Sequence, residues 1–339
     1  MTDKKRLKIV FHGANASNFE KGFSKLLGVD AEIKSLSDSL EEPHEREEYS
    51  AADVIIGNKL DGQLPFPKAL RLYHAPAAGT DAIDVNCLPT TAQLCNCFGH
   101  EDAIAEYVMA ALLRPHVPLE LADQGLRKGQ WTFWAGRPNA LRTELGGQRI
   151  GLLGYGHIGQ AVAKRAKAFG MSINVANRSV VDDPLVERCF GLNDLLAFAA
   201  SSDVIVVSLP HTQQTEGIVN ADFIDAMAPH AVLINVGRGP VVDEKSLFDA
   251  LKQKKLRGAV IDTWYQYPTA QHPECSPSQF DFSSLSNVLM TPHMSGWTAG
   301  MLTRRQLTMA ENIRRMIDGE NLLNCVWPSP ALKSARSHS

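Results

Sequence analysis

A glycine-rich turn between a strand and a helix constrains the fold of this chain more than any other feature. Residues 154–159 form the pattern G-x-G-x-x-G, directly after the apolar run Ile150 to Leu153 and at the start of a helix-like segment, His157 to Phe169. In such a turn the first glycine permits the bend, the second admits a pyrophosphate and the third lets the helix pack on the strand. The helix N-terminus then offers N–H groups to the phosphates. The pattern predicts a dinucleotide site made by Gly154, Gly156, His157, Ile158 and Gly159.

Short apolar runs alternate with helix-like segments along the whole chain, which predicts an α/β fold with parallel sheets. Six runs between residues 149 and 290 predict a doubly wound (Rossmann) dinucleotide-binding domain at 113–299. A length of 339 residues suggests about two domains. We expect a flavodoxin-like βα substrate domain from residues 1–112 and 300–330, including a C-terminal helix. Residues 331–339 are expected to be a disordered tail.

The segment between the two alternating regions has a different character. A helix predicted from Glu101 meets Pro115 and Pro118, which should kink or end it. The following residues, 124–145, carry Trp131 and Trp134 without a clear period. We interpret them as an extended arm of the kind that packs on a second subunit, and we expect a homodimer.

Composition matters mainly for what it excludes. A net charge of −3 argues against a nucleic-acid partner. No uncharged apolar stretch is long enough for a membrane span, and the N-terminus lacks the apolar core of a signal peptide. The six cysteines show no spacing typical of a metal site, so no metal is expected. Scattered thiols fit a reducing compartment and a cytoplasmic location.

The end of the second Rossmann strand bears on cofactor choice. Asn177, 18 residues after Gly159, stands where NAD-binding units carry an acidic residue, and Arg178 and Ser179 follow it. A carboxylate would repel a 2′-phosphate, whereas an arginine fork and a hydroxyl would bind one. These residues favour NADP(H) over NAD(H). The alternative is that Arg178 stacks on the adenine and NAD is used.

Four motifs together resemble the D-isomer-specific 2-hydroxyacid dehydrogenase family. They are GLLGYGHIG, VLINVGRGPVVDEKSL, GAVIDTW and TPHMSG, and they occur in the family's order and spacing. The resemblance extends roughly from Leu70 to Ile317, whereas the first 65 residues match only in their βα pattern. It implies hydride transfer between NAD(P)H and a small 2-keto or 2-hydroxy acid.

This reaction needs a cation for the substrate carboxylate and an acid for the developing alkoxide. The resemblance assigns these roles to Arg238 and His293, and substrate backbone contacts to Ala77, Ala78 and Gly79. It implies further cofactor contacts by Leu209, Pro210, Thr215, Val236, Gly237, Arg238, Asp262 and His293.

One position departs from the family pattern. Most members carry a glutamate five residues after the aspartate at 262, where it pairs with the catalytic histidine; this chain has Tyr267. A neutral hydroxyl can orient the ring but cannot stabilise imidazolium by charge, so the pKa of His293 should be lower. Glu274 and Asp281, in the following loop, are alternative sources of a carboxylate.

The leading interpretation is a D-2-hydroxyacid dehydrogenase that resembles glyoxylate or hydroxypyruvate reductases. A dinucleotide-sensing binding protein without enzymatic activity is an alternative, which Tyr267 favours and the presence of Arg238 and His293 disfavours. A formate- or phosphite-type dehydrogenase is a third, because formate oxidation requires no proton abstraction.

Overall fold

The computed structural model describes residues 6–269 and 272–328 and separates the chain into two compact units. One unit contains the residues up to Gly99 and those from Thr298 onward, and the other is His100–Trp297. The predicted tail at 331–339 lies outside the described residues. The predicted boundary at residue 112 is wrong, because it falls inside a helix, α4 (Glu101–His116).

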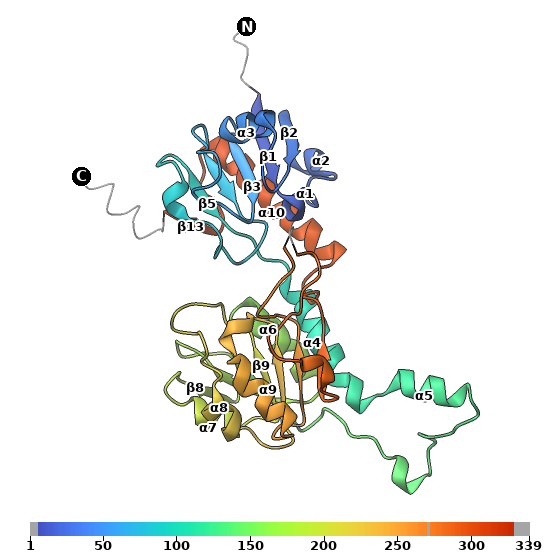
Figure 1. The fold of residues 1–339 in the computed structure, drawn as a ribbon. Helices are drawn as coiled ribbons and strands as arrows, with labels where there is room; N and C mark the ends of the chain where they lie inside the picture. Colours follow the sequence, from blue (N-terminus) through green and yellow to red (C-terminus); the bar gives the residue numbers. More distant parts are fainter. Residues whose placement is uncertain (1–5, 270–271, 329–339) are drawn as a thin grey trace. The chain divides into compact units, whose positions relative to one another are not determined.

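The His100–Trp297 unit is built on a seven-stranded parallel sheet (Figure 1). Its strands are β6 (Arg149–Leu153), β7 (Ser172–Ala176), β8 (Arg188–Phe190), β9 (Val204–Val207), β10 (Val232–Asn235), β11 (Gly258–Ile261) and β12 (Val288–Met290). The order β8-β7-β6-β9-β10-β11-β12 is the doubly wound order with one added strand, which confirms the predicted Rossmann fold. The short β8, with two exposed residues, was not predicted.

Helices cover both faces of this sheet. On one face α4 packs against α6 (His157–Ala168) through Ile104, Val108 and Val162, which explains why α4 belongs to this unit. The other face carries α7 (Leu195–Ala200), α8 (Ala221–Ala226) and α9 (Glu244–Lys252), with single-turn helices at Gly239–Val241 and Phe282–Ser284. Strands buried on both faces explain the continuous apolar runs in the sequence.

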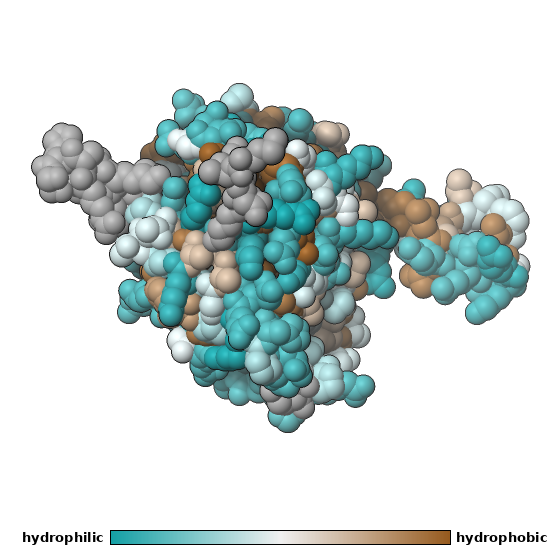
Figure 2. Space-filling model, turned by 90° about the horizontal axis from the view of Figure 1, so that it is seen from above, coloured by the Kyte–Doolittle hydropathy of each residue, from teal (hydrophilic) through white to brown (hydrophobic). Residues whose placement is uncertain are grey.

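An arm leaves this unit after α4. Pro115 lies in the last turn of α4, and α5 (Leu119–Leu126) begins after Pro118. Figure 1 shows α5 and the following loop, with a short turn of helix at Pro138–Ala140, extending away from the sheet. The arm exposes large apolar side chains, namely Leu119, Leu121, Leu126, Trp131, Trp134 and Leu141. Figure 2 shows brown, hydrophobic patches on the arm. The first residues of the predicted arm, 124–126, form the last turn of α5.

The other unit has a six-stranded sheet. Its strands are β1 (Leu7–His12), β2 (Ala31–Leu36), β3 (Val54–Gly57), β4 (Leu72–His74), β5 (Gln93–Cys95) and β13 (Cys325–Trp327). The order β2-β1-β3-β4-β5 is flavodoxin-like, as predicted, and β13 joins β5 in antiparallel orientation.

The helices of this unit pack on both sides of its sheet. α10 (Ala299–Asp318) begins at the Thr298 cap and lies with α1 (Ala14–Ser17) and α2 (Phe23–Leu27) over one core, while α3 (Pro43–Ser50) contributes Tyr49 to the other. A single-turn helix spans Val85–Cys87. The helical spacing of apolar residues over 18–27 does not give one continuous helix, because Gly22 adopts a left-handed conformation with φ of 80°. No helix among the described residues has the length and apolar character needed to cross a membrane.

Candidate functional site

The glycine turn joins β6 to α6 with the geometry that its sequence predicts. Gly154 has φ of 100°, and a Cβ atom there would lie 3.0 Å from Leu209 Cδ2. A Cβ on Gly159 would overlap the carbonyl oxygen of Gly154. Gly156, the residue before α6, has open space around its missing side chain. Packing within the chain therefore requires glycine at positions 154 and 159. Gly156 instead leaves room for another molecule beside the helix N-terminus, where His157 and Ile158 lie.

The residues after β7 present a cation at the same edge of the sheet. Asn177 donates from Nδ2 to the carbonyl oxygen (3.1 Å) and Oγ (3.2 Å) of Ser179, which fixes the turn. Arg178 is exposed, and within the described residues its side chain has no hydrogen bond or ion pair. Sequence reasoning missed Asp183, whose Oδ2 accepts a 2.9 Å hydrogen bond from Tyr155 of the glycine turn.

The loops after β9 and β10 meet beside the turn. Thr215 Oγ1 donates to the Pro210 carbonyl at 2.6 Å and closes the first loop. A Cβ on Gly237 would lie 2.7 Å from the Leu209 carbonyl oxygen, so only glycine fits the contact between the loops. Val236, just after β10, is buried.

Arg238 follows this glycine and is held by its own turn. The Asn235 side chain accepts from the Gly237 N–H (3.1 Å) and donates to the Arg238 carbonyl (3.1 Å). Arg238 Nη1 donates to the Gly237 carbonyl at 2.9 Å. The half-buried guanidinium influences the pKa values of both Tyr267 and His293, so the structure brings these three predicted residues together.

Asp262 fixes the loop that carries His293. Its fully buried carboxylate accepts hydrogen bonds from Thr291 Oγ1 (2.6 Å), Met294 N (2.9 Å) and Ser295 N (2.9 Å). These donors flank His293, whose φ of 56° is unusual for a residue with a side chain. The Asp262 carboxylate thus fixes the loop on both sides of His293.

Tyr107 supports the same loop, and sequence reasoning missed it. The Tyr107 hydroxyl, on α4, lies 2.6 Å from Thr291 Oγ1. Because Thr291 donates its single hydroxyl hydrogen to Asp262, Tyr107 is the donor in this contact. The pair is separated by 184 positions, so no local pattern in the sequence indicates it.

Tyr267 occupies the hydrogen-bonding position beside His293. Its hydroxyl oxygen lies 3.0 Å from His293 Nδ1 and accepts the Trp264 N–H at 3.0 Å. The phenolic hydrogen can donate to Nδ1 in the neutral tautomer that carries its ring hydrogen on Nε2. In the described part of the chain, neither Glu274 nor Asp281 hydrogen-bonds to His293, so the alternative source of a carboxylate is not found there.

The electrostatic surroundings favour the neutral imidazole. Loss of hydration lowers the pKa of His293 below its usual 6.5, the Arg238 charge lowers it further, and the Asp262 carboxylate only partly opposes them. Burial also raises the pKa of Tyr267, so its hydroxyl stays protonated at neutral pH. This direction agrees with the expectation drawn from the missing glutamate.

The predicted substrate loop, 77–79, belongs to the flavodoxin-like unit. Carbonyl groups in the loop and next to it already accept hydrogen bonds. Arg305 Nη1 donates to the carbonyl of the preceding Pro76 (2.8 Å), and Asn96 Nδ2 donates to the Ala78 carbonyl (2.6 Å). The N–H groups of residues 77–79 have no partner among the described residues. The loop therefore offers backbone donors to an anion.

Metal ligands are not gathered anywhere in the described part of the chain: no three His, Cys, Asp or Glu side chains lie together there as a metal would require. No disulfide bond joins any of the six cysteines within the described residues.

Comparison with known proteins gives the family. The model of the D-isomer specific 2-hydroxyacid dehydrogenase NAD binding domain matches residues 109–295, more than half of the chain. The chain belongs to this family.

Individual relatives show how far the similarity extends. A D-3-phosphoglycerate dehydrogenase of Archaeoglobus fulgidus is 28% identical over 88% of this chain and 55% of its own length. A hydroxyphenylpyruvate reductase of Plectranthus scutellarioides is 34% identical over 80% of this chain and 85% of its own. The chain spans only 52–61% of the length of the first three curated relatives that it matches.

Solved structures agree over nearly the whole chain. The NADPH-dependent glyoxylate/hydroxypyruvate reductase of Sinorhizobium meliloti, in complex with NADP and malonate, superposes with a TM-score of 0.74 at 26% identity. The match covers 96% of this chain and 98% of the other.

Proposed function

We propose that this chain transfers hydride between a nicotinamide dinucleotide and a small 2-keto or D-2-hydroxy acid, in the manner of glyoxylate or hydroxypyruvate reductases. The observation that carries the proposal is the hydrogen-bonded pair of Tyr267 and His293 in a unit that also presents Arg238 and the open glycine turn. The named activities of the Plectranthus and Sinorhizobium relatives support the substrate class.

The roles of the residues follow from their hydrogen bonds. The N–H groups of the 77–79 loop bind the substrate carboxylate, and Arg238 holds a carboxylate or polarises a carbonyl. The imidazolium form of His293 delivers its Nε2 proton to the developing alkoxide and becomes neutral, while the Tyr267 hydroxyl holds the Nδ1 side of the ring. Asp262 keeps the loop of His293 in place. The bound dinucleotide supplies the hydride.

The glycine turn fits a dinucleotide, and the residues after β7 favour its 2′-phosphorylated form. Gly156 leaves space beside the N-terminus of α6, as a pyrophosphate requires. Arg178 is exposed without an ionic partner in the described residues, and the Ser179 hydroxyl lies beside it. In the described part of the chain, the acidic side chain that bonds to the glycine turn is Asp183, which already accepts from Tyr155. We therefore propose NADP(H) over NAD(H).

A turnover assay tests both statements. Purified protein is mixed with NADPH or NADH and with glyoxylate, hydroxypyruvate, pyruvate or longer 2-keto acids, and cofactor absorbance is followed. We expect faster turnover with NADPH, and an Arg178→Ala variant should lose that preference. Faster turnover with NADH would keep the enzyme class and contradict the cofactor proposal. Cofactor binding without turnover from about pH 5 to 9, a range that brackets histidine titration, would favour a dinucleotide sensor instead.

The exposed apolar arm supports a homodimer. Leu141 is 88% exposed and Leu119 is 68% exposed, and Trp131 and Trp134 extend the apolar surface. Such exposure is costly in water unless another surface covers it. Light scattering should give twice the chain mass, and Leu121→Glu with Trp134→Glu should shift it toward the monomer. A monomeric parent protein at micromolar concentration would contradict this proposal.

We also propose a cytoplasmic location. The cysteines form no disulfide bond within the described residues, although Cys95 and Cys97 are close in sequence. Unpaired thiols are typical of a reducing compartment. Cell fractionation of the tagged protein tests the assignment, and recovery in an oxidising compartment would contradict it.

A further inference from the structure

A cavity lies at the edge of the Rossmann sheet opposite the glycine turn. It has a volume of about 290 Å³ and is lined by residues at the amino ends of β6, β9, β10 and β11, together with the last turns of α4. Gly154, Arg238 and His293 instead follow the carboxyl ends of their strands. The cavity is thus separate from the proposed dinucleotide site. Its volume is near the lower limit of pockets that hold small molecules.

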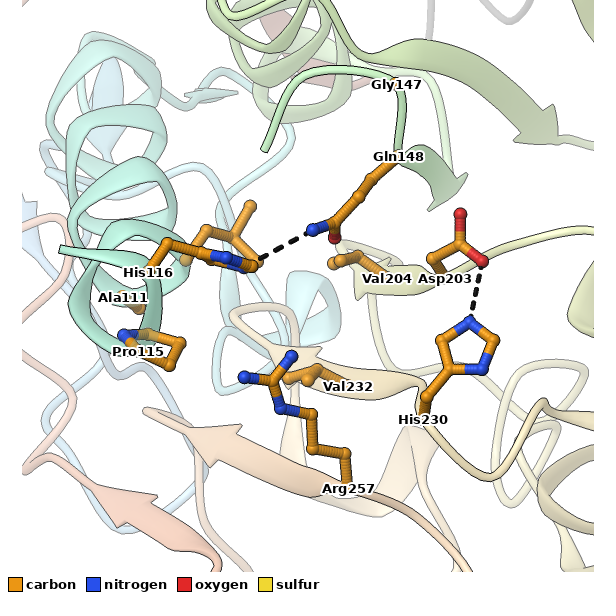
Figure 3. Close-up of a pocket in the computed structure, with 11 residues that line it drawn as sticks. Ala111, Pro115, His116, Gly147, Gln148, Asp203, Val204, His230, Val232 and Arg257 are labelled. Atoms are coloured by element: carbon orange, nitrogen blue, oxygen red, sulfur yellow. Dashed lines mark hydrogen bonds and ion pairs between the residues drawn. The ribbon is translucent and has the colours of Figure 1, made fainter. Parts of the chain in front are cut away.

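The cavity contains one positive charge that no carboxylate balances. Arg257, just before β11, is exposed, and within the described residues its guanidinium has no hydrogen bond or ion pair. Figure 3 shows this guanidinium extending toward the space below His116 and Gln148. Its charge contributes to lowering the pKa of His116, after burial of that ring, which places the two groups within electrostatic reach.

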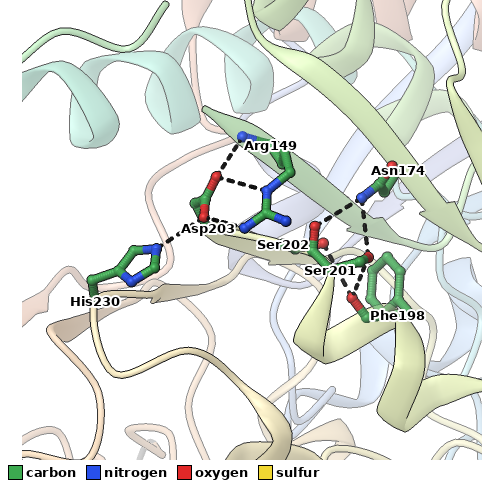
Figure 4. A network of polar contacts seen from close by, with 7 residues as sticks. All are labelled: Arg149, Asn174, Phe198, Ser201, Ser202, Asp203 and His230. Carbon is green, nitrogen blue, oxygen red and sulfur yellow. Dashed lines mark hydrogen bonds and ion pairs between the residues drawn. The ribbon is translucent and has the colours of Figure 1, made fainter. Parts of the chain in front are cut away.

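The acidic residue of the cavity is already neutralised by other groups. Asp203 accepts from Arg149 Nη2 (2.7 Å), Arg149 Nε (3.1 Å) and the Arg149 backbone N–H (2.8 Å), and His230 Nε2 lies 2.9 Å from Oδ1 (Figure 4). Arg149 holds the pKa of Asp203 far below its usual range, so this ion pair persists at all working pH values. The charge of Arg257 therefore remains available to an external anion.

The walls of the cavity are tied to the base of the arm. His116 is buried, its Nδ1 lies 2.7 Å from Thr143 Oγ1, and its carbonyl accepts from Arg142 Nη1 at 3.2 Å. Gln148 Nε2 donates to the Glu144 carbonyl at 2.8 Å and lies 3.4 Å from His116 Nε2. A ligand that contacts His116 and Gln148 would contact the residues that anchor the returning end of the arm.

We propose that this cavity binds a small oxyanion, a carboxylate or a phosphate, through the Arg257 guanidinium, and that the bound anion orders the base of the arm at residues 142–148. A guanidinium fork suits either group. His116 and Gln148 provide polar contacts for the rest of the ligand. The site would connect metabolite concentration with the arm, independently of the hydride-transfer proposal.

The test is calorimetric titration of the full chain with inorganic phosphate and, separately, with succinate, at constant ionic strength. We expect at least one anion to bind. Arg257→Ala should weaken that binding by about tenfold to a hundredfold, the usual effect of losing a charge-assisted pair. Arg238→Ala removes the anion-binding cation of the other edge and should leave this binding intact. Arg188→Ala, which changes another exposed arginine of the same unit, is the matched control.

Hydrogen exchange supplies a second readout. The bound anion should slow exchange at residues 142–148 in the parent and in Arg238→Ala, but not in Arg257→Ala. Stronger binding of phosphate or of succinate identifies the kind of ligand, and either supports the site. The proposal is overturned if neither anion binds at millimolar concentration, or if binding is lost in Arg238→Ala and kept in Arg257→Ala.

Discussion

The contact between Tyr267 and His293 gives the sharpest prediction. In the parent protein the tyrosine hydroxyl lies 3.0 Å from Nδ1, where it can donate to the neutral ring and so stabilise it. Protonation of the ring would place a hydrogen on Nδ1, facing a hydroxyl oxygen that already accepts the Trp264 N–H. Together with lost hydration and the Arg238 charge, this keeps the pKa of His293 below 6.5. Reduction of a keto acid consumes a proton, so the reductive rate should decline as pH rises through that lowered pKa.

Replacing the hydroxyl with a carboxylate should reverse the effect. An opposite charge within about 4–6 Å raises a histidine pKa by roughly 1–3 units, and each unit corresponds to about 1.4 kcal/mol of preference for imidazolium. The Tyr267→Glu variant should therefore maintain reduction to a pH about 1–3 units higher than the parent does. The measurement is kcat/KM for keto-acid reduction across the pH range, with an NMR titration of the His293 ring as a direct readout.

Two variants separate charge from packing. Tyr267→Phe removes the hydroxyl without adding charge and should not raise the pH limit. Tyr265→Phe changes a neighbouring tyrosine whose hydroxyl donates to the Val242 carbonyl, and its profile should match the parent's. Coincident profiles for Tyr267→Glu and the parent, with an unchanged His293 titration, would refute the reasoning.

Three further predictions follow from contacts described above. Tyr107→Phe removes the donor to Thr291 and should lower kcat without changing dinucleotide affinity, at a stability cost of about 1 kcal/mol in urea unfolding; an unchanged kcat would exclude a positioning role. Gly159→Ala forces a Cβ onto the Gly154 carbonyl, so calorimetry should show loss of dinucleotide binding. Burial lowers the pKa of His74 to about 4, so the unfolded chain takes up its proton first as pH falls. Its contribution to stability, complete above pH 6.5, should fall by about 3 kcal/mol between pH 6.5 and 4, and a His74→Asn variant should lose that part of the pH dependence.

Local patterns predicted the parts of the site that are local in the sequence. The glycine turn, its strand and its helix lie within twenty residues, and each glycine has its own steric or spatial reason. The cation Arg178 and the departure at Tyr267 could likewise be read from adjacent residues. Strands buried on both faces gave clear apolar runs, which is why most of the Rossmann sheet could be predicted.

Features that depend on distant contacts could not be predicted in this way. The apolar face of α4 fits either unit by its pattern, and only packing on α6 assigns it. β8 pairs with β7 over three residues and leaves little apolar signal. Gly22 interrupts a helical pattern by a backbone angle, which hydrophobic spacing does not record.

The structure also shows contacts of Asp262 that differ from the predicted ones. The family resemblance predicts a cofactor contact at Asp262, yet three hydrogen bonds to the residues around His293 occupy both of its oxygens. Its negative charge raises the pKa of His293 against the stronger effect of lost hydration. Asp262 is thus the carboxylate that remains near the ring when Tyr267 replaces the family's glutamate, but it acts across the loop and does not hydrogen-bond to the imidazole. Such a carboxylate can position the imidazole of His293 without bonding to a hydrogen on either ring nitrogen. The pH profile of keto-acid reduction, more than the rate at its optimum, should therefore report the effect of Tyr267 on His293.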